Sequence, residues 1–129
     1  MRAPAENAST RTSEGFQDLV VRQRAVELSL AVYRLTNSFP SSERFGLTNQ
    51  LRRASVSVAS NIAEGYGRST RGEYVFFLGH ARGSNCELLT QLVIANGLGF
   101  GSESERTFAR GLANEVVRML VVMMNKLRK

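Results

Sequence analysis

Arginine side chains that could contact phosphate are concentrated in one stretch of the chain, residues 39–71. This stretch reads FPSSERFGLTNQLRRASVSVASNIAEGYGRSTR and holds five arginines. Arginine carries a planar fork of donors that suits carboxylates and phosphates. The five predicted phosphate contacts are Arg44, Arg52, Arg53, Arg68 and Arg71. Aromatic residues do not interleave with these arginines as a base-stacking platform requires, so we expect nucleic-acid binding led by phosphates and strongly dependent on salt.

A polar stripe runs along the helix that is predicted for this stretch. Its members recur three or four residues apart, which places them on one helix face. They are Asn49, Arg53, Ser57, Ser60, Glu64 and Arg68. In a structural interpretation, the serines allow close helix packing and Glu64 pairs with Arg68. In a functional interpretation, the stripe lines a polar groove or a ring pore, and ring symmetry multiplies each arginine that faces a phosphate.

Catalytic and metal-binding constellations are missing from the sequence. His80 is the only histidine, and Glu87 and Glu64 are the carboxylates that could approach it. A di-metal site in a helical bundle needs paired Glu-x-x-His motifs. The glycines around Tyr66 follow a helix rather than a strand, so they are not a dinucleotide fingerprint. We therefore predict no catalytic residue, no metal and no cofactor, and a protein that is not an enzyme.

Composition restricts the class of protein further. The length of 129 residues fits one domain. The net charge is +6, and all but two of the 17 basic residues are arginines, which favours an anionic partner unless it reflects genomic base composition. Because Cys86 is the single cysteine, an intramolecular disulfide is excluded. A lone cysteine within an apolar helix is usually buried. The chain shows neither a long apolar run nor a signal-peptide pattern, so we predict a cytoplasmic protein without membrane contact.

The elements that position these residues are predicted to be helices throughout. Residues 1–15 are small, polar and aperiodic, which is typical of a disordered leader. Residues 16–129 form one domain with helical periodicity and no alternating strand pattern. Four helices of about 20–27 residues with short connections predict an all-α, up-down-up-down antiparallel four-helix bundle.

The first two helices surround the proline at position 40. The first is expected from about Phe16 to Ser38, because the residue before a proline leaves the helical conformation. The second is expected from an N-cap at Ser42 to Glu64. Gly65 and Gly67 would then supply the positive φ of a helix C-cap. The apolar stripes that should be buried are Val21, Ala25, Leu28, Val32, Leu35 and Phe39, followed by Leu47, Leu51, Ala54, Val58 and Ile62.

The last two helices begin with capping boxes. Thr70 and Glu73 predict the start of a third helix that ends near Asn96. Ser102 and Glu105 predict the start of a fourth that reaches about residue 127. The expected apolar sides are Tyr74, Phe77, Leu78, Ala81, Leu88, Leu92 and Ala95 in the third helix, and Phe108, Leu112, Val116, Met119 and Met123 in the fourth.

The predicted helices are apolar over a wider arc than a monomeric bundle needs. A second apolar stripe lies beside the core stripe of the second helix, and the fourth helix has one as well. Large exposed apolar patches mark interaction sites, so we predict a homo-oligomer. The predicted interface residues are Val56, Ala59, Ala63, Tyr66, Val117 and Met124. Gly79, Gly83 and Ser84 add a small-residue patch on the third helix, which favours close packing.

Several motifs resemble one specific bacterial family. They are FP at 39–40, FGL at 45–47, QLRRA at 50–54, NIAEGYGR at 61–68, FL at 77–78, ARGS at 81–84 and GLGF at 97–100. The chain resembles, from about Phe16 to Leu127, the four-helix-bundle family found as open reading frames within intervening sequences of 23S ribosomal RNA genes. Two positions depart from the family pattern. Arg22 stands where the family often has Trp, and Ala59 where it often has Pro, which leaves the second helix straighter.

The resemblance implies a cytosolic bundle that assembles as a closed ring, a homopentamer, without an established activity. A more distant relative by fold is the accessory protein of diversity-generating retroelements, which is pentameric and binds nucleic acid and a reverse transcriptase. We therefore predict a non-enzymatic protein whose ligand is RNA or DNA, held by arginines of the second helix and its flanking turns. The alternative is a protein-interaction scaffold that docks a nucleic-acid enzyme and contacts nucleic acid little itself.

Overall fold

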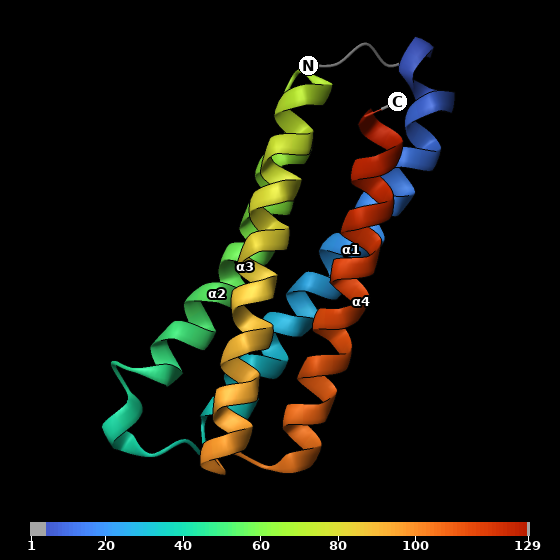
Figure 1. Cartoon of the computed structure of the whole chain (residues 1–129). Coiled ribbons are helices and arrows are strands. Elements are labelled where there is room, and N and C mark those ends of the chain that lie inside the picture. The colour runs from blue at the N-terminus through green and yellow to red at the C-terminus, as the bar shows by residue number, and fades with distance from the viewer. Residues whose placement is uncertain (1–4, 129) are drawn as a thin grey trace.

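The computed structural model describes residues 5–128, and their side chains from Gly15 onward. The elements are α1 (Ala5–Thr36), η1 (Ser41–Glu43), α2 (Leu47–Tyr66), α3 (Arg71–Leu98) and α4 (Glu103–Arg128). The four α-helices lie side by side in one bundle (Figure 1). Among the described residues, α1 and α3 each pack against α2 and α4 but not against each other. The predicted antiparallel four-helix bundle is therefore confirmed, with α1 and α3 at opposite corners.

The core consists of two clusters of buried apolar side chains along the bundle axis. One lies toward the turn between α1 and α2 and includes Leu35 and Leu51. The other lies toward the turn between α2 and α3 and includes Val58 and Leu120. Every apolar residue predicted to be buried in the first two helices is buried, and full burial of a large aliphatic side chain contributes roughly 1.5–3 kcal/mol. In the last two helices, Phe108 departs from the prediction because it is exposed, and Tyr74, Phe77 and Met119 are only half-buried.

The start of α1 falls inside the segment that was predicted to be a leader. The helix begins at Ala5 rather than at about Phe16, and it ends at Thr36. The disordered leader over residues 1–15 stays a prediction, as does the division into 1–15 and 16–129. Residues 1–4 lie outside the described part of the chain, and so do the side chains of residues 5–14.

The predicted N-cap of α2 is wrong. Ser42 lies in the short helix η1, and α2 begins five residues later at Leu47. The cap position is Gly46, which has no side chain to accept a hydrogen bond. Instead, the carboxylate Oε1 of Glu43 accepts from the backbone N–H of Leu47 at 2.9 Å. A longer side chain one turn earlier thus replaces the short capping residue, satisfying one of the free donors at the helix start.

The predicted role of the glycines after α2 is also wrong. The helix continues through Gly65, and Gly67 has a φ of −80°, so neither residue supplies a left-handed cap. The glycines with positive φ are Gly99 and Gly101, at 72° and 75°. Gly65 is needed because α3 is close: a Cβ there would lie 2.9 Å from the Cβ of Phe77.

Both predicted caps of the later helices are confirmed. The hydroxyl of Thr70 accepts from the N–H of Glu73 at 3.1 Å, and the hydroxyl of Ser102 accepts from the N–H of Glu105 at 3.1 Å. Each bond satisfies a donor that would otherwise have no partner in the first helical turn. The helices α3 and α4 consequently begin within one residue of the predicted positions.

Polar contacts fix the helices against one another. The Nε of Arg24 in α1 donates to Glu115 in α4 at 3.0 Å. This bond raises the pKa of Arg24, so the guanidinium stays charged. The amide of buried Asn85 donates to the backbone oxygen of Ala113 at 3.0 Å, joining α3 to α4. Cys86 is exposed, contrary to prediction. No helix of the described residues is long and apolar enough to cross a membrane.

Candidate nucleic-acid interface

The five predicted arginines do not form one patch. Arg52 and Arg53 lie in the first two turns of α2, close to Arg44 in the preceding turn, whereas Arg68 and Arg71 flank the connection to α3. A rise of 1.5 Å per residue puts about 21 Å of helix between Arg52 and the end of α2 at Tyr66, and Arg68 lies two residues farther on. The structure therefore brings the predicted contacts into two groups at opposite ends of α2.

Arg52 is held against α1. Its Nε donates to the hydroxyl of Thr36 at 2.8 Å, and its Nη2 donates to the side-chain oxygen of Asn37 at 3.3 Å. The guanidinium also lies over the ring of Tyr33, 4.6 Å from the ring centre. These contacts use two of the five N–H donors and one face of the guanidinium, so Arg52 ties α2 to the end of α1.

Arg68 also has partners within the chain. Its Nη2 lies 3.1 Å from the carboxylate of Glu64, which confirms the predicted i,i+4 pair. The guanidinium is 4.7 Å from the ring centre of Phe77. Because both charged side chains are about half exposed, the ion pair itself adds little stability.

Arg44, Arg53 and Arg71 have exposed side chains. None of the three forms an ion pair among the residues that the structure describes. Arg44 lies 5.4 Å from the ring centre of Phe45, and that ring is 85% exposed. Sequence reasoning missed this combination of arginine and open aromatic ring. The available signal was an aromatic residue next to an arginine in a turn, outside every apolar stripe.

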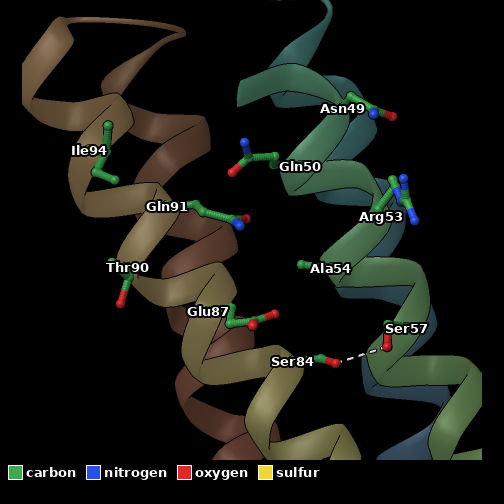
Figure 2. A pocket seen from close by; sticks show the side chains of 10 residues that line it. All are labelled: Asn49, Gln50, Arg53, Ala54, Ser57, Ser84, Glu87, Thr90, Gln91 and Ile94. Atoms are coloured by element: carbon green, nitrogen blue, oxygen red, sulfur yellow. Dashed lines mark hydrogen bonds between the residues drawn. The ribbon is translucent and has the colours of Figure 1, made fainter. Parts of the chain in front are cut away.

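The polar stripe of α2 lies beside a groove between α2 and α3 (Figure 2). The groove has a volume of about 670 Å³. It is lined by Asn49, Gln50, Arg53, Ala54, Ser57, Ser84, Glu87, Thr90, Gln91 and Ile94. The hydroxyls of Ser57 and Ser84 meet at 2.8 Å, so the helices are close there and the groove opens from this contact toward the start of α2. The predicted packing role of the serines is confirmed at Ser57.

The groove offers hydrogen-bonding groups rather than reactive ones. Gln50 and Gln91 point toward one another across it, and Arg53 points outward from the other side of α2 (Figure 2). Glu87 adds a carboxylate on the wall formed by α3. Amide and hydroxyl side chains donate and accept hydrogen bonds but need an activating base for catalysis.

His80 lies outside this groove. Its ring packs on the ring of Phe76 with centres 4.5 Å apart, and it lines a shallow cavity that also includes Glu87. Within the described residues, no group of three histidine, cysteine or carboxylate side chains could hold a metal ion. We therefore assign His80 to an aromatic contact on the surface of α3.

A smaller cavity of about 170 Å³ lies at the connection between α2 and α3. Arg68, Ser69, Thr70 and Arg71 contribute to its lining. These residues precede or begin α3, where the backbone N–H groups and the helix dipole favour an anion. The second group of predicted arginines thus lies where two cationic side chains, two hydroxyls and a helix start converge.

The predicted interface residues have unequal exposure. Val56 and Ala63 are exposed, while Ala59, Tyr66 and Val117 are half-buried. Met124 is 2% exposed and belongs to the core cluster around Val58. The single chain therefore leaves Met124 no surface for a partner. The sequence candidates for the interface were Val56, Ala59, Ala63, Tyr66, Val117 and Met124.

Comparison with known proteins identifies the family. No curated protein sequence matches the chain. A solved structure of a protein of unknown function from the S23 ribosomal protein family of Bacteroides thetaiotaomicron has the same fold, with a TM-score of 0.77 and 17% identity. That likeness covers 84% of this chain and 98% of the other. The model of the 23S rRNA-intervening sequence protein family matches residues 17–122, so the chain belongs to that family.

Proposed function

We propose that this protein is a non-enzymatic, cytoplasmic homopentamer that binds RNA or DNA through exposed arginines of α2 and its flanking turns. The observation that carries the proposal is the state of Arg44, Arg53 and Arg71. All three are exposed and lack an ion pair among the described residues, in a chain with a net charge of +6. Free guanidinium groups on a basic surface attract phosphate at long range and pair with it on contact.

The arrangement supports binding that is led by the phosphate backbone. Arg53 borders the groove between α2 and α3, and Arg71 lines the cavity at the start of α3. In a ring, each arginine recurs once in every subunit, so a modest charge per chain adds up to a strong local potential. Contacts of this type carry no base sequence information and release counterions when they form.

A fluorescence anisotropy titration with a generic labelled RNA, repeated at rising salt concentrations, tests the proposal. We expect tight binding at low salt and a steep loss of affinity as salt increases. The double variant Arg53→Ala, Arg71→Ala should bind more weakly and show a shallower salt slope, by roughly 0.7 for each single-strand phosphate that is no longer neutralised. The matched control removes the same charge from α4 with Arg110→Ala and Arg118→Ala, and it should keep most of the affinity.

Two results would contradict the proposal. If the protein bound no RNA at low salt, the arginines would have a structural role only. If both double variants lost RNA affinity equally, the binding would depend on net charge and not on Arg53 and Arg71. The alternative function, a scaffold that docks a nucleic-acid enzyme, is favoured by the open ring of Phe45. Large exposed aromatic side chains are typical anchors of protein interfaces, so Phe45→Ala should then abolish partner binding while RNA binding is absent throughout.

A further inference from the structure

The outer face of α1 carries a row of large apolar side chains, interrupted by the exposed Gln23, although it points away from the core. Its large side chains are spaced three, four or seven residues apart, and they are 41–66% exposed. They are Phe16, Leu19, Val26, Leu30 and Tyr33. Because the buried stripe of α1 occupies the opposite side, this helix is apolar on two faces. A helix of that kind is normally covered on both sides.

The outer face of α3 is hollowed and of mixed character, because the exposed His80 and Glu87 lie between its large apolar side chains. Phe76 and Ile94 are exposed at its two ends, and Gly79 and Gly83 lie between them on the same side. A Cβ at Gly83 would meet nothing within 4 Å. A cavity of about 390 Å³ follows this face beside Phe76 and the two glycines. The face therefore has the shape that receives a ridge of larger side chains.

The outer faces of the other two helices are mostly polar, although α2 also exposes Val56 and α4 exposes Val122. The outer residues of α2 are Asn49, Arg53, Ser60 and Glu64, and those of α4 include Arg110, Asn114, Arg118 and Asn125. Because α1 and α3 occupy opposite corners, the raised face of α1 and the hollowed face of α3 lie on opposite sides of the molecule.

The hydrogen bonds between helices set the relative heights of these two faces. Ser29 in α1 contacts Ser55 in α2 at 3.2 Å, and Ser57 in α2 contacts Ser84 in α3 at 2.8 Å. Ser55 lies two residues before Ser57 in α2. Because α3 runs antiparallel to α2, the residue of α3 that is level with Ser55 lies two positions after Ser84. Ser29 is therefore level with about Cys86 of α3. Three residues earlier on both helices, Val26 is level with Gly83.

We propose that the raised α1 face of one copy packs into the hollowed α3 face of the next, with the helices parallel and Val26 against Gly83. This interface rests on the proposed homo-oligomer and specifies how it is built. Contact between two different faces is head-to-tail, and this is the kind of contact that closes a ring of more than two subunits. Large side chains on one helix and glycine on the other allow close approach.

The residues at the edge of the α1 face indicate which helix lies toward the axis of the proposed ring. Arg52 and Ser55 mark the side of α2 that faces α1, and Val56 lies next to them and is exposed. The apolar surface of α1 therefore continues onto α2. A ring that uses this surface places α2 toward its axis and α4 outside. Arg53 then faces the interior of the ring.

Area and charge favour a second copy as the occupant. Five or six large side chains that are about half exposed present roughly 500 Å² of apolar surface, which is the apolar share of a standard interface of about 800 Å² per partner. Along the α4 edge of the contact, Glu27 of one copy is level with about Ser84 of the next. Arg82 lies half a turn away there, so the contact brings a second cation toward Glu27, which pairs with Arg24 of its own chain at 3.3 Å.

Sedimentation velocity of full-length variants tests the two faces. Leu30→Glu on α1 should convert the oligomer to monomers, whereas Val122→Glu on α4 should leave it intact. The pair is matched, because Leu30 is 52% and Val122 51% exposed. Gly83→Leu should also give monomers while keeping or raising the helical content, since the added side chain has free space within one chain.

Disulfide cross-linking through the native Cys86 tests the pairing of the two faces. In oxidised Val26→Cys protein, we expect a ladder of covalent species that ends at the subunit number of the ring. Removing the partner thiol with Cys86→Ser should abolish the ladder. Covalent dimers alone would show α1 paired with α1 and overturn the head-to-tail interface.

The two proposals fail in different ways. A wild-type protein that sediments as a monomer at micromolar concentration would overturn the homopentamer and this interface together. A wild-type oligomer that survives both Leu30→Glu and Gly83→Leu would overturn the interface alone. Dissociation of the Val122→Glu control would likewise contradict the assignment of the faces.

Discussion

The contact between α2 and α3 is closed at one end and open at the other. At the closed end, Gly65 is buried and lies against Tyr74 and Phe77 of α3. At the open end, the same two helices border a groove of about 670 Å³. The hydrogen bond between Ser57 and Ser84 separates the two regions. One pair of helices therefore provides both a tight packing surface and an accessible polar site.

The difference lies in the size of the residues at the contact. Glycine and serine let the backbones approach at the closed end, whereas Gln50 and Gln91 extend into the gap at the open end (Figure 2). The buried apolar stripe of α2 continues past both regions without a break. The periodicity that builds a helix thus does not determine how close its neighbour lies, because residues beside the stripe do so.

The largest effect is expected at the closed end, from Gly65→Ala. The new methyl group would lie 2.9 Å from the Cβ of Phe77 and 3.2 Å from the backbone oxygen of Tyr74. Overpacking of this kind costs about 1–3 kcal/mol, which exceeds the gain in helix propensity. Urea denaturation followed by circular dichroism, at one fixed protein concentration, measures the loss.

The control for this variant is Gly111→Ala in α4. A Cβ at Gly111 meets nothing within 4 Å, so alanine should stabilise the protein by up to about 1 kcal/mol. Equal stability of Gly65→Ala and the wild type would show that the two helices are not held together at this end.

The second largest effect is expected on the side of α2 that faces α1. There, Arg52 holds α2 against the end of α1. Arg52→Ala removes hydrogen bonds to Thr36 and Asn37 and the contact with the ring of Tyr33. We expect a loss of about 1–2 kcal/mol. Arg53→Ala, one position away, should stay within about 0.5 kcal/mol of the wild type because its side chain has no such partners.

These two arginines separate stability from binding in one experiment. Each variant is measured by urea denaturation and by RNA anisotropy. Arg53→Ala should weaken binding at unchanged stability, and Arg52→Ala should lower stability at largely unchanged phosphate affinity once folded. The reverse outcome would exchange the roles that the structure assigns to the two residues.

The two neighbours also show how far the sequence alone can predict the site. Spacing correctly places Arg53 on the polar stripe and predicts the pair of Glu64 with Arg68. It does not distinguish Arg52, because its partners Thr36 and Asn37 are more than fourteen residues away and come close only through the turn before α2. Which arginines are free is a property of the folded chain.

The fold was more predictable, since it depends on apolar spacing and on local capping patterns. The stripes of the first two helices and the caps at Thr70 and Ser102 are confirmed. Ser42 and Gly65 were misassigned for physical reasons that a local pattern does not contain. Glu43 reaches the start of α2 from a 3₁₀ turn. Gly65 is required by the close approach of α3, not by its own backbone angles.

A smaller effect is expected at the boundary between the closed and open regions. Ser57→Ala removes the hydroxyl that bonds Ser84 and accepts from the amide of Asn61. The cost should be about 0.5–1.5 kcal/mol. In a double-mutant cycle, Ser57→Ala with Ser84→Ala should cost less than the sum of the single changes, because neither hydroxyl is then left without its partner. Simple additivity would show that the two serines do not interact.

The smallest effect is expected at the open end, from Gln91→Leu. The side-chain oxygen of Gln91 is buried and has no hydrogen-bond partner among the described residues. Removing such a group costs nothing in hydrogen bonds, and leucine gains apolar contact with Ile94 across one turn. Stability should therefore stay within about 0.5 kcal/mol of the wild type or rise slightly.

Gln50→Leu, on the opposite wall of the groove, is the matched control for Gln91→Leu because the side chain of Gln50 is exposed. A loss above about 1 kcal/mol in Gln91→Leu alone would mean that the assembled protein satisfies this amide, and the groove would then be closed by a neighbouring subunit rather than open to ligand.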